Sequence, residues 1–176
     1  ALVKLDDEIV FFNHEDFLLT GSPQLRHFLD AVELVKSGRL DYFNFGIGGY
    51  QIGYPLAGRK SVAKYINRAS PWIFSLQPSL WNRKKLIDLL SRHRGESIWE
   101  FEASAQKTFR KLSLRGGFSR RRGKKRGSLH WDNPFYPYIA TAIVKGKWNT
   151  SEYPLELEEM FECYGQPDSN RQSNAP

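Results

Sequence analysis

The sequence has little cysteine and no long apolar run. Its single cysteine, Cys163, has no second thiol to pair with, which excludes an intrachain disulfide and any CxxC-type metal site, and we expect it to be a small core residue. No apolar run reaches the roughly 18 residues that a membrane-spanning helix needs. The N-terminal residues also lack the basic-then-apolar layout of a signal peptide. These absences favour a globular protein of the cytoplasm.

Acidic residues are absent from one long stretch of the chain. The formal net charge is +7, and nine lysines and arginines lie between Arg110 and Arg126 with no acid among them, so subtracting nine from +7 leaves −2 for the remainder. We expect this basic stretch to form a loop, which could bind nucleic acid, bind anionic lipid headgroups, or simply be solvated. Its one aromatic residue, Phe118, provides no stacking platform for single strands, so nucleic acid is the weakest interpretation.

The composition suffices for one domain with its own core, since 40% of the 176 residues are apolar, among them 12 Phe, 8 Tyr and 5 Trp. Strand-like and helix-like segments alternate, which predicts the α/β class with a mixed sheet flanked by helices. We expect one domain at 1–165 and a disordered polar tail at 166–176. The expected strands are 7–12, 40–46, 71–77 and two pieces in 128–135 and 138–146, and the expected helices are 22–38, 79–95, 97–112 and 150–165.

Local signals predict how several of these elements begin and end. Ser22 is expected to cap the first helix, with Pro23 in its first position. Ser97 and Glu100 have the spacing of a capping box. Five glycines and a proline at 46–58 predict a flexible loop without regular structure. The first strand, rich in apolar residues, is expected to be covered on both faces.

Two acids, Glu15 and Asp16, follow the first expected strand. Open α/β sheets bind ligands outside the carboxyl ends of their strands. Adjacent carboxylates at such an end are a minimal site for Mg²⁺ or Mn²⁺, which shares the rest of its coordination shell with water and substrate phosphates. The alternatives are a solvated turn and a strand that continues through 17–19.

Two glutamates, Glu100 and Glu102, begin the third expected helix. We expect Glu100 to bond back to the N-cap amide, which is a structural role. Glu102 has no such role, and the nearby helix N-terminus favours its ionised form. It could therefore act as a general base toward a substrate hydroxyl, although an ordinary surface glutamate fits the pattern equally well.

Four motifs in sequence order resemble a known family. They are "EDFLL" at 15–19, "FSLQPSLWNRKKLIDLL" at 74–90, "ESIWEFE" at 96–102 and "YPYIATAIVKGKWN" at 136–149. Together they resemble the C-terminal half of a family of bacterial glycosyltransferase-like proteins with the GT-A fold, which binds nucleotide-diphospho-sugars. The resemblance covers nearly the whole chain and implies a GT-A-like mixed sheet that lacks the first nucleotide-binding βαβ unit.

This resemblance implies a metal-assisted, inverting glycosyltransferase of polysaccharide or glycan synthesis. It would take a nucleotide-sugar donor and a glycan or lipid-linked acceptor, in the cytoplasm or at the inner membrane face, where the basic stretch would meet anionic lipid. Glu15 and Asp16 then bind the divalent cation, with His130 as a further ligand, although the family's acidic motif is Asp-x-Asp and this chain has "HED". Glu102, beside Glu100, then stands on the acceptor side as the catalytic carboxylate.

The sugar itself is expected to contact Gln77, Trp81 and Trp99. Gln77 follows an apolar segment and can bond a sugar hydroxyl, whereas the two indole rings can stack on a sugar face. Packing in the core is the alternative for each tryptophan, and a packed strand position is the alternative for His130.

Overall fold

The computed structural model describes residues 2–46, 52–55, 63–93, 97–119, 123–126 and 130–165, which form a mixed α/β fold. The helices are η1 (Leu2–Lys4), α1 (Leu25–Lys36), α2 (Arg83–Ser91), α3 (Ile98–Lys111) and α4 (Pro154–Tyr164). The main sheet contains β1 (Ile9–Phe12), β3 (Tyr42–Asn44), β4 (Gly53–Pro55), β5 (Ala63–Ile66), β6 (Ser79–Asn82) and β7 (Gly116–Ser119). Short ribbons contain β2 (Leu18–Leu19), β8 (Lys125–Arg126), β9 (His130–Trp131), β10 (Tyr138–Ile139), β11 (Ile143–Val144) and β12 (Lys147–Trp148).

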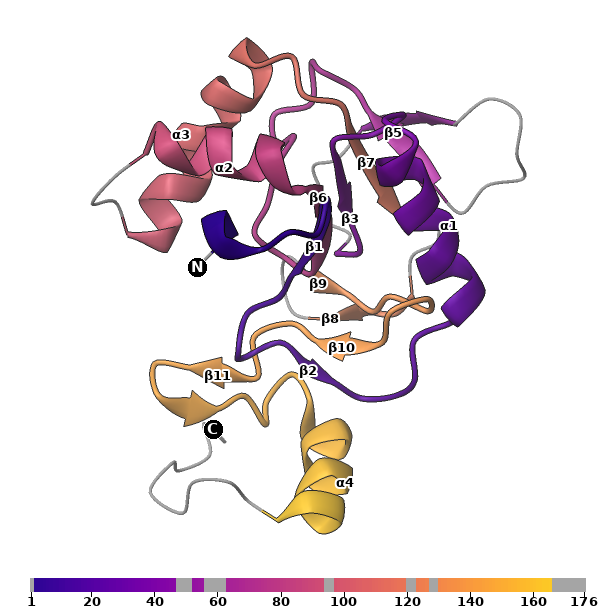
Figure 1. Cartoon of the computed structure of the whole chain (residues 1–176). Helices are drawn as coiled ribbons and strands as arrows, with labels where there is room; N and C mark the ends of the chain where they lie inside the picture. The colour runs from indigo at the N-terminus through magenta and orange to yellow at the C-terminus, as the bar shows by residue number, and fades with distance from the viewer. Residues whose placement is uncertain are drawn as a thin grey trace.

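The six strands of the main sheet run in the order β1-β6-β3-β7-β5-β4. β3 pairs in parallel with β7, and β6 pairs antiparallel with both β1 and β3. β1, β3 and β7 therefore point the same way, and their carboxyl ends share one edge, called the carboxyl edge below. In Figure 1 this edge faces down, toward the ribbons and α4. The predicted α/β class and mixed sheet are confirmed, whereas the GT-A assignment stays a prediction.

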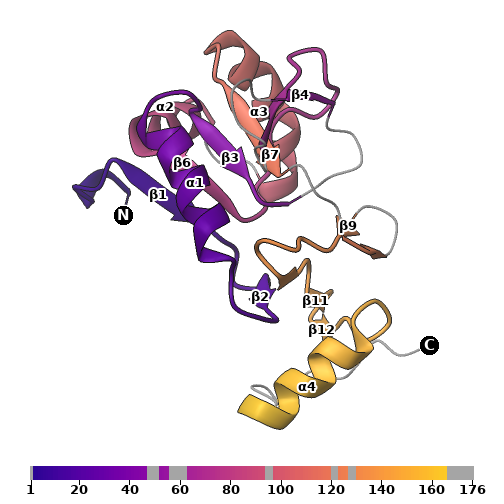
Figure 2. The same cartoon turned by 90° about the vertical axis from the view of Figure 1, so that its right-hand side faces the viewer.

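Helices cover both faces of the sheet. Successive residues of a strand point to opposite faces, and accordingly Tyr42 belongs to the apolar cluster that contains Leu86 of α2 and Phe109 of α3, whereas Phe43 belongs to the cluster that contains Val35 of α1. Figures 1 and 2 show α1 on the opposite side of the strands from α2 and α3. Two apolar clusters, one on each face, thus form the body of the protein.

A separate group of elements lies beyond the carboxyl edge of the sheet and is called the third layer below. It consists of the short ribbons and α4, which lies at the bottom of Figures 1 and 2. Its own apolar cluster contains Ile139, Ala142, Trp148, Tyr153 and Leu157. This third layer places polar side chains opposite the ends of the parallel strands.

The first helix is confirmed, but its predicted cap is wrong. The N-cap is Gln24, without a side-chain cap, so Ser22 and Pro23 precede the helix. The reason is a contact from the third layer, because Gln24 donates its backbone N–H to the Phe135 carbonyl at 2.9 Å. A tertiary hydrogen bond thus determines where α1 begins.

The strand predicted at 71–77 is wrong. Strand β6 follows it, inside the segment that was expected to be helical, and α2 begins only at Arg83. Residues 73–76 of the predicted segment are nevertheless buried, and the Gln106 side chain takes the place of a strand partner for them. Its Oε1 accepts from the N–H groups of Ile73 at 2.8 Å and Phe74 at 3.1 Å.

The basic stretch is not one loop, which corrects the sequence interpretation. It includes the end of α3 and the whole of β7, a central strand in which all four residues are buried. Gly117 fits there because an added Cβ would meet Leu40 Cδ1 at 2.5 Å. Arg110 donates to the Ser70 carbonyl at 2.6 Å, so it contacts its own chain. The arginines at 120–122 lie outside the described residues.

Other predictions have mixed outcomes. The helices at 97–112 and 150–165 are confirmed, and the capping box of α3 is present. β1 is an edge strand in which only Val10 is buried, so it is not covered on both faces. β4 lies within 46–58, where no regular structure was expected, and β5 was not predicted. Cys163 is exposed rather than buried, and the tail at 166–176 lies outside the described residues.

In the described parts of the chain, every helix is too short or too polar to cross a membrane.

Candidate functional site

The acidic pair lies in a tight turn just beyond β1. The Phe17 N–H donates to the His14 carbonyl at 3.2 Å, so Glu15 and Asp16 occupy the two central positions of a four-residue turn. The Asn13 side chain closes this turn by donating to the carbonyls of His14 at 2.8 Å and Phe17 at 3.2 Å. Glu15 is exposed and Asp16 is half-buried. Glu15 and Asp16 thus lie in a turn, which was the alternative to a metal site, and this turn lies at the carboxyl edge.

Contacts on both sides hold this turn against the third layer. The His14 ring packs edge-on between those of Phe12 and Phe17, with centroid distances of 5.1 and 5.2 Å. The Asp16 carbonyl accepts from the Ala142 N–H at 2.9 Å. Directly after the turn, β2 pairs antiparallel with β10. The two acids are thus joined to the ribbon that carries Tyr138.

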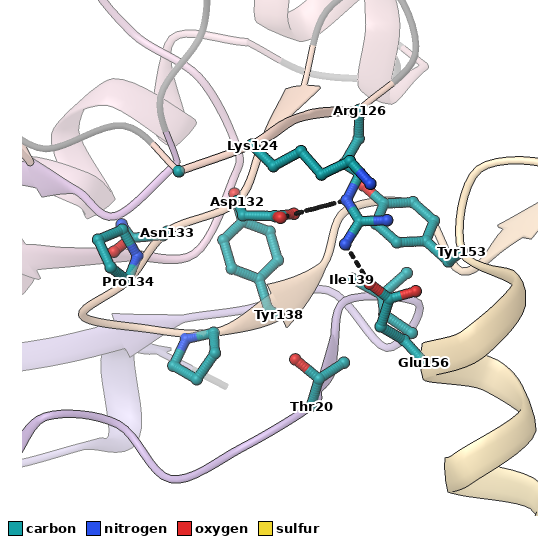
Figure 3. Close-up of a pocket in the computed structure, with 12 residues that line it drawn as sticks. Thr20, Lys124, Arg126, Asp132, Asn133, Pro134, Tyr138, Ile139, Tyr153 and Glu156 are labelled. Carbon is teal, nitrogen blue, oxygen red and sulfur yellow. Dashed lines mark hydrogen bonds and ion pairs between the residues drawn. The ribbon is translucent and has the colours of Figure 1, made fainter.

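A pocket of about 280 Å³ lies in the third layer, next to this ribbon. Figure 3 shows that its wall combines side chains from segments far apart in the sequence. They come from the end of β2, from β8, from the segment between β9 and β10, from β10 itself and from α4. The polar members are Thr20, Lys124, Arg126, Asp132, Asn133, Tyr138, Tyr153 and Glu156.

Several contacts hold the side chain of Arg126 in the pocket. Its Nε donates to both carboxylate oxygens of Asp132, at 3.1 and 3.2 Å, and its Nη2 donates to Glu156. Its Cζ lies 5.4 Å from the centroid of the Tyr153 ring, which is a cation–π distance. Burial opposes the charge, but the two carboxylates raise the pKa of the guanidinium above its ordinary value. Arg126 is therefore a fixed cation between two carboxylates (Figure 3).

Gln77, a predicted sugar contact, connects the carboxyl edge with this pocket. It is half-buried, and the Tyr138 hydroxyl donates to its Oε1 at 3.4 Å. Burial raises the pKa of Tyr138, so the phenol stays protonated and can donate. Gly46, which follows β3, packs against the same side chain, because an added Cβ would lie only 2.8 Å from the Gln77 Cβ. Gln77 thus stands between the strand ends and the pocket.

Glu102 has a structural contact that the sequence does not reveal. Its Oε1 accepts from the Leu76 N–H at 2.7 Å, one residue before Gln77. Burial raises the pKa of the Glu102 carboxyl, and the hydrogen bond from Leu76 opposes this shift. A raised pKa brings a carboxylate closer to what a general base needs at neutral pH. The contact also means that Glu102 positions the chain that leads into Gln77.

Glu100 performs the structural role of the capping box. Its Oε2 accepts from the Ser97 N–H at 2.8 Å, and Ser97 Oγ accepts from the Glu100 N–H at 3.3 Å. Accepting this bond from the Ser97 backbone lowers the pKa of the Glu100 carboxyl. A carboxylate of lowered pKa that is engaged in a cap is a weak base. The catalytic role predicted for Glu100 therefore has no support in this geometry.

The two predicted tryptophan contacts differ. Trp81 is 0% exposed and packs on Tyr42 at a centroid distance of 4.3 Å. It cannot stack on a ligand there, so the prediction is wrong for Trp81 and the core alternative is confirmed. Trp99 is 77% exposed in the first turn of α3, next to Ile98, which is 43% exposed. Sugar stacking by Trp99 stays a prediction.

The predicted metal ligands are not gathered in one cluster. Throughout the described ranges, no three His, Cys, Asp or Glu side chains lie close enough to hold one metal ion. His130 lies in β9 with its Nδ1 4.0 Å from Glu152 Oε2, and burial lowers its pKa although Glu152 opposes this. The prediction that His130 binds the cation together with Glu15 and Asp16 is therefore wrong. The two acids by themselves still fit Mg²⁺, which is commonly bound by one or two carboxylates together with substrate phosphates.

The pocket residues were not predicted as a site. From the sequence, Arg126 is one cation of a loop and Asp132 is part of a strand. Their partner Glu156 lies 30 residues after Arg126, so no local spacing connects the three. One signal was present, because "DNP" at 132–134 is a turn sequence and argues against a continuous strand at 128–135.

Comparison with known proteins assigns no family to this chain. No family model matches it, and no curated protein matches it either.

Proposed function

We propose that this protein is a glycosyltransferase that moves a sugar from a nucleotide-diphosphate donor to a hydroxyl of a glycan or lipid-linked acceptor. The observation that carries the proposal is the turn with Glu15 and Asp16. It lies at the carboxyl edge, where open α/β sheets bind ligands, and it is bonded to the ribbon that lines the pocket. A mixed sheet in which β6 lies antiparallel between β1 and β3 is compatible with a GT-A-like fold.

The proposed reaction is a single inverting displacement. The acceptor oxygen attacks the anomeric carbon and forms a new C–O bond while the C–O bond to the diphosphate breaks. The nucleoside diphosphate leaves with the electron pair, and the acceptor proton passes to the Glu102 carboxylate as general base. The raised pKa of Glu102 and its bond to the segment entering Gln77 support this assignment. Gln77 would bond a hydroxyl of the transferred sugar.

Glu15 and Asp16 would hold the divalent cation, Mg²⁺ or Mn²⁺, of this reaction. When bound, such a cation neutralises charge on the leaving diphosphate. Two adjacent carboxylates without a cation would repel the diphosphate by like charge. Donor binding is therefore expected to require the cation, and the hydrogen bonds from Asn13 keep the turn in place for it.

The double variant Glu15→Gln/Asp16→Asn tests the donor site. We expect it to lose cation-dependent binding of nucleotide sugars, with an affinity roughly tenfold lower or worse, because neutral amides are poorer ligands for a hard cation. Calorimetric titration with a panel of uridine, guanosine, adenosine and thymidine diphospho-sugars, with and without Mn²⁺, measures this. The matched control is Asp6→Asn/Asp7→Asn, which removes the same charge from exposed residues before β1.

Two results would contradict the proposal. One is that no diphospho-sugar of the panel binds the parent protein, with or without the cation. The other is that both double variants weaken binding equally, which would indicate a general charge effect.

Glu102→Gln should bind the donor as the parent does, but its donor turnover should fall by about 10²–10⁴ if Glu102 is the base.

A further inference from the structure

The charges of the pocket cancel one another. Two cations, Lys124 and Arg126, and two carboxylates, Asp132 and Glu156, line it. Both carboxylates are bonded to the Arg126 guanidinium, which is 16% exposed. A phosphate or carboxylate ligand would have to displace them from Arg126 and would meet their repulsion. The pocket therefore favours a neutral ligand over an anion.

The same wall is rich in both hydrogen-bond acceptors and donors. The acceptors include the carboxylates of Asp132 and Glu156, and the donors include the hydroxyl of Thr20 and the ammonium of Lys124 (Figure 3). Glu156 Oε2 is buried and accepts no hydrogen bond from any residue that the structure describes. A ligand with several hydroxyl groups on a small ring, each able to donate and accept, matches this pattern.

Apolar surface and size narrow the ligand further. Pro134, Pro137 and Ile139 line the pocket beside the polar groups, and such carbon surface can contact the C–H face of a sugar ring. The volume of about 280 Å³ lies just below the roughly 300–1,000 Å³ that holds drug-sized ligands. One sugar ring fits this volume better than a whole nucleotide sugar does.

We infer that this pocket binds one neutral sugar ring, and, if the proposed function holds, that this ring is the acceptor. The bond from Tyr138 to Gln77 connects the pocket with the carboxyl edge. The acceptor hydroxyl would therefore approach the donor from the third layer. Asp132, Glu156 and Thr20 fix the ring through its hydroxyl groups, and Arg126 orients both carboxylates.

Sugar binding can be measured without any donor. Methyl glycosides of glucose, galactose, mannose and N-acetylglucosamine are titrated into the full chain, and the backbone amide shifts are followed by NMR. We expect saturable shifts for at least one of them, concentrated at Lys124, Asp132, Ile139 and Glu156. Inorganic phosphate at equal ionic strength should produce no saturable shift at these positions, and binding of phosphate alone would overturn the inference.

Two variants connect the binding to the pocket. Glu156→Gln and Thr20→Val should each weaken sugar binding, Glu156→Gln by about tenfold or more because it removes a charged acceptor. The matched control is Glu159→Gln, an exposed residue of the same helix α4, and it should bind as the parent does. If no glycoside binds, if the shifts lie elsewhere, or if Glu159→Gln is weakened equally, the inference is wrong.

The glycoside titration tests the pocket, and the donor titration tests the proposed function. Either one can fail without the other. Glu15→Gln/Asp16→Asn should leave sugar binding intact, since those acids lie outside the pocket lining. Donor binding without glycoside binding would keep the transferase and place its acceptor elsewhere. Glycoside binding without donor binding would leave a sugar-binding protein that is not a glycosyltransferase.

Discussion

Glu102 combines two roles at the scale of a single residue. Its pattern in the sequence allows a surface glutamate or a base, and the structure adds the bond from the Leu76 N–H at 2.7 Å. The carboxyl is half-buried, and burial raises its pKa above the ordinary value of 4.5. The Glu102 carboxyl therefore binds its proton more tightly in the folded protein than in the unfolded chain.

This shift predicts a pH dependence of stability. Because the folded-state pKa is raised, the unfolding free energy falls as the pH rises from the ordinary value of 4.5 through the raised value. Glu102→Gln keeps an acceptor for Leu76 without the charge, so the variant should lose this dependence and be at least as stable as the parent at about pH 7. Urea unfolding at a series of pH values between about 4 and about 7 measures it.

Glu102→Ala is the comparison for this prediction. It removes the acceptor as well as the charge, so it leaves the Leu76 N–H unpaired and should cost about 1–2 kcal/mol at neutral pH. Equal pH dependence in the parent and in Glu102→Gln would show that the burial of this carboxyl has no effect on stability.

At the scale of elements, helix α3 provides the hydrogen bonds that a neighbouring strand would otherwise provide to the buried segment 73–74. The Gln106 side chain, 6% exposed, accepts from two backbone N–H groups of the segment before β6. Its Nε2 donates to the Phe74 carbonyl at 2.7 Å. The backbone of this apolar segment is thus satisfied without a ladder, which a periodicity argument cannot foresee.

Gln106→Ala should therefore be strongly destabilising. It leaves the N–H groups of Ile73 and Phe74 buried without an acceptor, and we expect a loss of about 2–4 kcal/mol in the unfolding free energy. Denaturant unfolding measures the loss. The exposed neighbour Lys107→Ala is the control and should stay within about 0.5 kcal/mol of the parent. Similar values for both variants would refute the bridging role of Gln106.

At the scale of the whole molecule, the third layer has its own small apolar cluster beyond the sheet. Arg126 ties this layer together, because it joins β8 to Asp132, which follows β9, and to Glu156 of α4. The two larger clusters contain no residue of α4. Loss of Arg126 should therefore loosen the third layer more than the sheet.

The variant Arg126→Met tests this arrangement. It keeps much of the side-chain volume but leaves two partly buried carboxylates unpaired, so we expect a loss of about 2–3 kcal/mol. Hydrogen exchange should accelerate in 141–165, whereas β3, β6 and the residues Tyr138 and Ala140, which belong to the apolar cluster on the α1 face, stay protected. The control is Arg92→Met, whose pair with Asp88 is exposed, with side-chain exposures of 52% and 43%, and worth at most about 0.5 kcal/mol. Uniform acceleration over all strands would contradict the proposed separation of the layer.

The predictions from the sequence succeeded where the signal was local. Ser97 and Glu100 form the predicted capping box because both hydrogen bonds lie within one turn of a helix. The predictions failed where partners are distant, as at Trp81, whose burial depends on sheet pairing with β1 and β3. The prediction for Glu15 and Asp16 succeeded only in part. Their place after a strand could be predicted from the sequence, but their turn geometry and their bond to the third layer could not.

The sequence by itself determined the α/β class, the helices α1, α3 and α4, and an acidic pair just after the first strand. These features follow from spacings of three to four residues and from apolar runs, which act within one element. Only the tertiary structure decided that Glu102 bonds the chain before Gln77 and that Arg126 gathers Asp132 and Glu156 around a pocket. Such contacts depend on which buried donors and acceptors the packing of the layers brings together. Local residue spacing does not determine these pairs.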